Sequence, residues 1–232
     1  MHDQDSLTEA FDEIFRIIDD IPEQTCGGSQ PRFLYDLSHA TKDKGEIVEI
    51  GTRSGKSTIA LAYGQKAKSG RGRSVHTIDI AKHPDLEANL ERADVTTFVQ
   101  RVVKPSSKVV ETWDQDIELL FVDADHRYNG IVSDLRNWCQ FVIVGGKVAL
   151  HDYPGFDGVN DTCRAVCRTL LARPNVWRVV ADREAGSIIV FERLITDQEA
   201  VADRPSFRNW IKWKINNLKW YFDERRLRMK SK

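Results

Sequence analysis

Val48-Glu49-Ile50-Gly51-Thr52-Arg53-Ser54-Gly55-Lys56-Ser57-Thr58 is the stretch around which this chain of 232 residues is organised. The apolar run that ends at Ile50 has the length of a buried strand. Gly51 and Gly55 permit a sharp turn and let a ligand approach the backbone closely. A helix begins after them, and its free N–H groups favour a polar or anionic ligand. Strand, turn and helix together predict a nucleotide-type pocket at the carboxyl end of a parallel strand.

Three kinds of ligand-binding loop share this outline, and their spacing separates them. A phosphate-binding P-loop has four residues between its first glycine and Gly-Lys-Ser, whereas three residues separate Gly51 from Gly55. A dinucleotide loop of the form G-x-G-x-x-G needs a glycine where Arg53 stands. The spacing E-x-G-x-x-x-G, made by Glu49, Gly51 and Gly55, is the pattern of S-adenosylmethionine-dependent methyltransferases. A tight turn without a ligand remains open from this loop alone.

The composition is that of a globular chain. Hydrophobic residues make up 41% and charged residues 30%, so a sizeable core is expected and extensive disorder is not. The length suits one domain with an extension. The formal net charge is −1, which provides no global attraction to nucleic acid or to a membrane surface. We therefore expect no nucleic-acid partner.

The cysteines and the N-terminus favour a cytoplasmic protein. The four cysteines are Cys26, Cys139, Cys163 and Cys167, and none forms a C-x-x-C pair. Reduced thiols are therefore the default expectation. The acidic N-terminus lacks the basic and apolar regions of a signal peptide, and no apolar run approaches membrane-spanning length.

Strand and helix patterns alternate along the chain. Helices are expected over Leu7–Ile18, around Phe33–Ala40, from Ser57 to about Lys68, over Pro84–Arg92, from Tyr128 to Val142 and over Val159–Leu170. The expected strands are Glu46–Ile50, Ser74–Ile80, Thr97–Val103, Ile117–Val122, Lys147–Leu150, Trp177–Ala181 and Ser187–Phe191. Gly145-Gly146 is expected to be a turn.

This order predicts an α/β fold with a doubly wound, Rossmann-like sheet that is mostly parallel and has helices on both faces. The last two strands are joined by a tight hairpin, so one of them must be antiparallel. A parallel sheet that ends in an antiparallel strand is the methyltransferase variant of this fold. We divide the chain into a helical lead-in over 1–45, a cofactor-binding domain over 46–194 and a C-terminal helix over 195–232.

Acidic side chains follow three of the expected strands. Asp79 ends the second strand, where an acid in doubly wound folds accepts hydrogen bonds from a ribose. Asp123, His151 and Asp152 follow two further strands and could converge on one divalent cation, with Mg²⁺ or Mn²⁺ as the candidates. His126 has a pKa suited to removing a proton near neutrality. Helix capping by the acids, and a loop role for His126, are the alternatives.

Four motifs, in this order and spacing, resemble class I S-adenosylmethionine-dependent O-methyltransferases. They are Val-Glu-Ile-Gly-Thr with Gly-Lys-Ser-Thr, then Ile-Asp, then Phe-Val-Asp-Ala-Asp-His-Arg-Tyr, and finally Gly-Gly-Lys-Val-Ala-Leu-His-Asp-Tyr. The nearest branch resembles bacterial small-molecule and sugar methyltransferases. The catechol and caffeoyl-coenzyme A O-methyltransferases are more distantly similar. The similarity covers roughly Phe33 to Arg193.

The resemblance implies roles for individual residues. The residues implied for S-adenosylmethionine binding are Glu49, Gly51, Thr52, Ser54, Gly55, Asp79, Ser106, Ser107 and Asp123, with Ser106 or Ser107 near the adenine. Asp123 matches the first metal aspartate of the catechol-type enzymes, and His151 and Asp152 occupy the positions of their second metal pair. His151 replaces an acid there. His126 stands where those enzymes carry a catalytic lysine, so Asp123 and His126 are the implied catalytic residues.

The C-terminal segment is basic, aromatic and amphipathic. From Asp203 to Lys232 it carries ten Lys or Arg against three Asp or Glu. Phe207, Ile211, Ile215, Leu218 and Phe222 recur at helical spacing. We expect a helix that docks on the body or joins two subunits into a homodimer. Peripheral contact with an anionic membrane is a less favoured alternative.

The sequence therefore predicts an enzyme that transfers a methyl group from S-adenosylmethionine to a hydroxyl of a small molecule, such as a sugar, a phenol or a natural product. We expect assistance from a divalent metal. The alternatives are a metal-independent O- or N-methyltransferase, a non-catalytic nucleotide-binding protein of the same fold, and a P-loop hydrolase. The acceptor cannot be read, because acceptor pockets on this fold are built from variable loops and termini.

Overall fold

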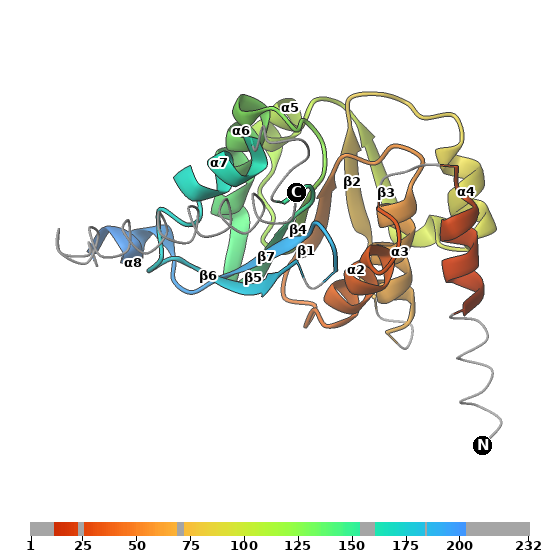
Figure 1. Cartoon of the computed structure of the whole chain (residues 1–232), viewed down its shortest axis with the longest axis horizontal. Helices are drawn as coiled ribbons and strands as arrows, with labels where there is room; N and C mark the ends of the chain where they lie inside the picture. The colour runs from red at the N-terminus through yellow and green to blue at the C-terminus, as the bar shows by residue number, and fades with distance from the viewer. Residues whose placement is uncertain (1–11, 23–25, 69–71, 154–160, 184, 203–232) are drawn as a thin grey trace, which may run out of the picture.

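The computed structural model describes residues 12–22, 26–68, 72–153, 161–183 and 185–202. Its centre is a sheet with the strand order β3-β2-β1-β4-β5-β7-β6 (Figure 1). The strands are β1 (Glu46–Ile50), β2 (Val75–Asp79), β3 (Val99–Val103), β4 (Ile117–Val122), β5 (Val142–Leu150), β6 (Trp177–Asp182) and β7 (Ile189–Arg193).

Strands β1 to β5 are parallel to one another, and β7 joins β5 in the antiparallel sense. Strand β6 then pairs with β7 to form the hairpin at the edge of the sheet. The chain moves outward through β1, β2 and β3 and then returns to β4 on the other side of β1. The order therefore reverses between β1 and β4, and a doubly wound sheet binds its ligands above the carboxyl ends of the strands at this point.

Helices surround the sheet on both faces. They comprise a helix over 12–20, α2 (Gln30–His39), α3 (Lys56–Lys66), α4 (Leu86–Arg92), α5 (Ser106–Val109), α6 (Tyr128–Trp138), α7 (Asp161–Arg168) and α8 (Asp197–Ala202). Short 3-10 turns, η1 (Thr96–Phe98), η2 (Val110–Thr112) and η3 (Cys139–Phe141), precede or follow the strands.

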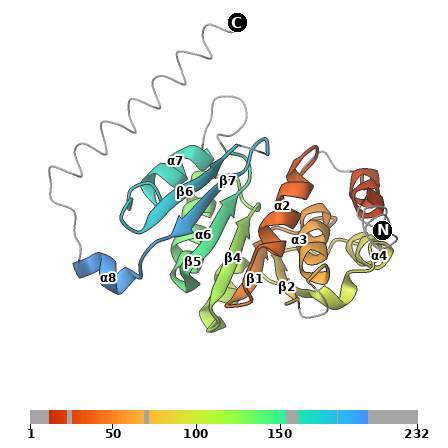
Figure 2. The same ribbon diagram turned by 90° about the horizontal axis from the view of Figure 1, so that it is seen from below.

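Two hydrophobic cores follow from the alternation of side chains along the strands. On one face, Ile47 and Phe121 pack with Leu34 of α2 and Ile59 of α3. On the other face, Val48, Leu120 and Val148 pack with Leu135 and Trp138 of α6 and Val166 of α7. Figure 2 shows α2 and α3 on one side of the strands and α6 and α7 on the other. The predicted fold class, including the final antiparallel strand, is confirmed.

The prediction was wrong at Gly145-Gly146. Both glycines lie inside β5, which begins at Val142 rather than at Lys147. Ile117 of β4 pairs with Val142, and Leu119 pairs with Lys147, so β5 carries extra residues in a bulge against β4. Gly145 adopts a φ of 82°, which only glycine takes without strain. The helix expected to reach Val142 accordingly ends at Trp138.

Within the described ranges, no helix is long and apolar enough to cross a membrane. The expected C-terminal helix lies outside the described residues, apart from α8 at its start. The proposed division into lead-in, domain and tail stays a prediction.

Candidate cofactor and catalytic site

A cavity of about 510 Å³ lies above the carboxyl ends of β1, β2 and β4. Its walls combine the turn after β1, the end of β2, the start of α5, the loop after β4 and one side chain of α6. They are formed by Ile50, Gly51, Arg53, Ile78, Asp79, Ile80, Ala81, His83, Ser106, Asp123, Ala124, Asp125, His126, Arg127 and Asp134. The cavity therefore occupies the place at which the strand order reverses.

Gly51 brings the turn after β1 against the end of β4. Its φ is 99°, and a Cβ atom there would lie 2.0 Å from the Asp123 carbonyl oxygen. The Asp123 N–H donates to the Ile50 carbonyl at 2.8 Å, and the Gly51 N–H donates to the Ile78 carbonyl at 2.9 Å. The glycine is thus required for three strand ends to meet beneath the cavity.

Gly55 is the N-cap of α3 and has a φ of 95°. A Cβ atom there would approach Leu86 Cδ1 at 2.7 Å. Neither Gly55 nor Ser54 lines the cavity. Their part is to shape the turn, and the Ser54 carbonyl accepts a hydrogen bond from Asn89 at 2.9 Å.

Glu49 lies beneath the turn and is fully buried. Its Oε2 accepts hydrogen bonds from the hydroxyls of Thr58 and Thr77, each at 2.6 Å. Its Oε1 is buried and has no hydrogen-bond partner within the described chain. Burial raises the pKa of Glu49 to about 7 although several hydroxyl donors lower it. Glu49 therefore connects β1, β2 and α3 and does not line the cavity.

Asp79 holds the glycine turn through backbone donors. Its Oδ2 accepts from the N–H groups of Thr52 at 3.0 Å and Arg53 at 3.2 Å, and its Oδ1 accepts from Ala81 at 2.9 Å. Burial raises the pKa of Asp79, but these donors and the nearby His83 outweigh it and keep the pKa below its ordinary value. The carboxylate lines the cavity and has about one acceptor position left, since it offers about four and three are used.

Three predicted residues converge at the other side of the cavity. Ligand atoms of Asp123, His126 and Asp152 all lie within 4.8 Å of one another. His126 Nδ1 lies 2.9 Å from Asp152 Oδ2. The bond with Asp152 raises the pKa of His126 above its ordinary value, against the opposing effect of burial. Asp152 is buried and adopts a φ of 55°, which is uncommon outside glycine.

His151 is buried behind this group. Its Nδ1 lies 3.2 Å from Asp123 Oδ1 and 3.1 Å from Asp152 Oδ1, and its Nε2 lies 3.1 Å from Gln30 Oε1. Burial lowers the pKa of His151, but the two carboxylates outweigh it and raise the pKa to about 10. A charged ring between two carboxylates compensates their charge. The structure therefore brings His126, rather than His151, into the group of three that could hold a metal.

Ser106 and Asp134 form a polar wall on the β3 side. Ser106 begins α5 just after β3, and its Oγ donates to Asp134 Oδ1 at 2.6 Å. Both line the cavity, whereas Ser107 does not. Asp134 belongs to α6 and is 6% exposed. Its place in the wall was not visible in the sequence, because Asp134 is one polar position on a helix whose apolar residues step at regular gaps.

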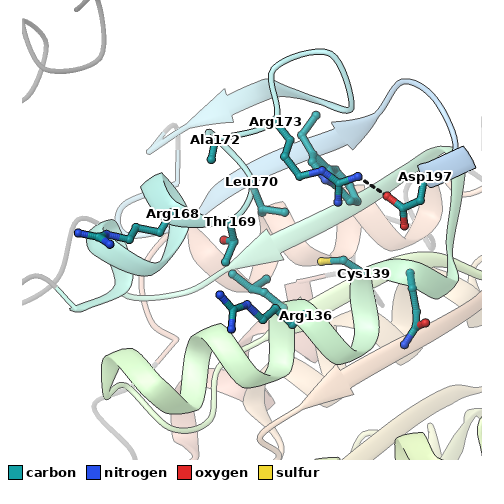
Figure 3. Close-up of a pocket in the computed structure, with 11 residues that line it drawn as sticks. Arg136, Cys139, Arg168, Thr169, Leu170, Ala172, Arg173 and Asp197 are labelled. Carbon is teal, nitrogen blue, oxygen red and sulfur yellow. Dashed lines mark hydrogen bonds and ion pairs between the residues drawn. The ribbon is translucent and has the colours of Figure 1, made fainter. Parts of the chain in front are cut away.

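A second cavity, of about 250 Å³, lies between α6, α7 and β6. Figure 3 shows Arg136, Cys139 and Arg168 around it and the ion pair between Arg173 and Asp197. Burial raises the pKa of Cys139 to about 12, so its thiol is not reactive near neutrality. No residue of the predicted site lines this second cavity.

Comparison with known proteins agrees with this geometry. Residues 48–153 match the family model described as "Methyltransferase domain". An uncharacterized protein of Acanthamoeba polyphaga mimivirus is 26% identical over 152 residues, which cover 62% of this chain and 63% of that protein. Catechol O-methyltransferase of Mycobacterium tuberculosis is 34% identical over 112 residues, which cover 47% of this chain and 49% of that enzyme. The chain thus spans less than two thirds of the length of these relatives.

A solved O-methyltransferase of Bacillus cereus, determined with S-adenosylhomocysteine, has the same fold with a TM-score of 0.58. It is 19% identical, and the match covers 81% of this chain and 91% of that structure. The resemblance inferred from the motifs is therefore confirmed at this level: residues 48–153 match the methyltransferase-domain model, and the chain shares the fold of this solved O-methyltransferase.

Proposed function

We propose that this chain transfers a methyl group from S-adenosylmethionine to a hydroxyl group of a small molecule. One observation carries the proposal: the glycine turn, Asp79 and the His126–Asp152 pair belong to one site at the carboxyl ends of neighbouring strands. A cofactor bound by the turn would therefore meet its acceptor next to an imidazole. Proximity of this kind is a main source of rate acceleration in group transfer.

The residues around the cavity suit S-adenosylmethionine. The volume falls within the range of small-molecule sites. The Asp79 carboxylate is fixed by three backbone donors and has about one acceptor position left for a ribose hydroxyl. S-adenosylmethionine would supply a methyl group bonded to a positively charged sulfur. The task of the chain's own residues is to hold the acceptor oxygen in line with that bond and to manage its proton.

A divalent cation, Mg²⁺ or Mn²⁺, is part of the proposal. Asp123, His126 and Asp152 offer three ligand atoms close together, and two of them are carboxylate oxygens of the kind that these ions prefer. Such an ion would lower the pKa of a nearby hydroxyl. His126 would then serve as a ligand in the place that the sequence assigned to His151.

A metal-independent form of the reaction is the second candidate, and the 2.9 Å contact between His126 and Asp152 favours it. In this form His126 accepts the proton of the acceptor hydroxyl, and Asp152 orients the ring and stabilises its charged state. The two forms use the same residues in different roles, so residue identity alone does not choose between them.

The acceptor class and the setting of the reaction are also proposals. A sugar, phenol or natural-product hydroxyl fits the relatives, one of which is a catechol O-methyltransferase. A cytoplasmic location, a homodimer formed through the C-terminal helix, the weaker possibility of membrane contact by that helix and the absence of a nucleic-acid partner stay predictions.

Calorimetry with S-adenosylmethionine, S-adenosylhomocysteine and ATP tests the cofactor. We expect both sulfur-containing nucleosides to bind and ATP not to. Transfer of labelled methyl groups to a panel of catechols, flavonoids and nucleotide sugars then tests the reaction. Binding of ATP in place of S-adenosylmethionine would refute the proposed function.

A further inference from the structure

Asp134 is a buried carboxylate that the proposed reaction does not use. It is 6% exposed and lines the cavity from α6. The Ser106 hydroxyl donates to its Oδ1 at 2.6 Å, and no other hydrogen bond to this carboxylate occurs in the part of the chain that the structure describes. A carboxylate has about four acceptor positions, and burying one without donors is costly. Asp134 is therefore equipped to accept a hydrogen bond from a ligand in the cavity.

The strand order places Asp134 relative to the rest of the site. Its partner Ser106 follows β3, Asp79 ends β2, and His126 follows β4. Along the sheet, Asp79 thus lies between the Ser106–Asp134 wall and the His126–Asp152 pair. A nucleoside whose ribose binds Asp79 and whose reacting group points toward His126 must extend its base toward Ser106 and Asp134. This step rests on the proposed function.

The same part of the cavity offers an apolar surface. Ile80 directly follows Asp79, lines the cavity and is 76% exposed, although large aliphatic side chains are usually covered. A planar heterocycle would cover Ile80 while its edge meets polar groups. An exposed isoleucine beside a buried acceptor pair therefore matches a flat base with a donor on its rim.

We propose that Asp134 recognises the exocyclic amine of the cofactor's adenine, with Ser106 holding its carboxylate in place. The amine offers hydrogens only, whereas the keto oxygen of hypoxanthine offers only lone pairs and would face the carboxylate oxygens. A buried acceptor that faces another acceptor costs more binding free energy than the loss of one hydrogen bond. Asp134 thereby selects 6-amino over 6-oxo purines.

The test compares S-adenosylhomocysteine with S-inosylhomocysteine, its 6-oxo analogue, by calorimetry on the full chain. We expect the wild type to prefer the amino form by at least about tenfold. An analogue with carbon in place of N7 keeps the amine and should bind like S-adenosylhomocysteine. In Asp134→Asn, the amide oxygen still accepts from Ser106 while the NH₂ group becomes a donor. This variant should lose most of the preference by binding the amino form more weakly and the oxo form more tightly.

Asp114→Asn is the matched control, because Asp114 is an exposed carboxylate in the loop before β4. It should keep the wild-type preference. Equal binding of the two ligands by the wild type, or an equal loss of both in Asp134→Asn, would overturn the role of Asp134 while leaving the proposed function intact. Failure of the wild type to bind S-adenosylhomocysteine at all would overturn both. If the variant does not fold, the preference of the wild type for the amino ligand over the oxo ligand decides whether the proposal stands.

Discussion

His126 Nδ1 lies 2.9 Å from Asp152 Oδ2, which joins the loop after β4 to the end of β5. The sequence assigned these two residues to different tasks, a base and a metal ligand. Parallel pairing of β4 with β5 aligns Val122 with Leu150, and the residues that follow each strand therefore meet. The His126 side chain is 57% exposed and the Asp152 side chain 12%. The imidazole is therefore open to the cavity, whereas the carboxylate that holds it is mostly buried.

This pairing predicts that His126→Ala and Asp152→Asn lower turnover strongly with little change in cofactor affinity. A general base or a metal ligand contributes about 10²- to 10⁴-fold to the rate. Cofactor affinity should change little, because the groups proposed to hold the cofactor are the glycine turn and Asp79. The measurements are kcat, from labelled methyl transfer, and the Kd for S-adenosylhomocysteine. His39→Asn is a control, because His39 ends α2 and its ring stacks on Tyr35 outside the cavity. Unchanged kcat in both site variants would remove these residues from the chemistry.

Metal removal distinguishes the two forms of the proposal. We expect the chelator-treated protein to lose turnover and to recover it with Mg²⁺ or Mn²⁺, because Asp123, His126 and Asp152 supply a compact ligand set. Mn²⁺ binding, followed by electron paramagnetic resonance without any substrate, should disappear in Asp123→Asn. Full turnover in chelator together with no Mn²⁺ binding would select the metal-independent form, in which His126 accepts the proton.

The sequence predicted those parts of the site that depend on strand ends. Apolar residues recur along each strand from β1 to β4, and a glycine, a proline or an acid marks its end. The strand ends are therefore visible in the sequence, and the acids there lie at the sheet edge by topology. Side-chain direction was not visible. Glu49 points into the interior rather than into the cavity, and His151 turns behind Asp123 and Asp152. Asp134 was missed because only the packing of α5 on α6 brings Ser106 to it.

Two glycines with similar backbone angles should differ greatly in their tolerance of a side chain. Gly51 has a φ of 99° and Gly145 a φ of 82°, so alanine is strained at both positions by about 1–2 kcal/mol. At Gly51 the new Cβ would also lie 2.0 Å from the Asp123 carbonyl oxygen, whereas nothing lies within 4 Å at Gly145. The backbone of Asp123 directly follows a central strand, so it cannot move away without a large loss of stability.

We therefore expect Gly51→Ala to lower the free energy of unfolding by more than about 3 kcal/mol and to weaken cofactor binding. Gly145→Ala should lower the free energy of unfolding only by its backbone strain, about 1–2 kcal/mol. Urea unfolding of the two variants provides the comparison. Similar losses in both would mean that the turn can move away from β4 and that Gly51 is not what fixes the floor of the cavity.

The buried Glu49 makes the stability of the protein depend on pH. Burial raises its pKa from 4.5 to about 7 in the folded chain, while the unfolded chain keeps the ordinary value. Between these two values the folded state binds a proton that the unfolded state has released. The free energy of unfolding therefore falls as the pH rises through this window, by about 1.4 kcal/mol per pH unit and about 3 kcal/mol at most in total. Above pH 7 this contribution becomes constant, because both states are then ionised.

Glu49→Gln removes the titration and keeps an oxygen that can accept from Thr58 and Thr77. The variant should therefore gain stability relative to the wild type as the pH is raised from 5 to about 8, when both are unfolded in urea at each pH. Glu111→Gln is the matched control, because Glu111 is exposed and pairs with Lys108 at the surface. Its stability should follow the wild type across the range. A wild-type curve parallel to that of Glu49→Gln would mean that the folded chain holds this carboxylate at its ordinary pKa, with a donor that reaches Oε1.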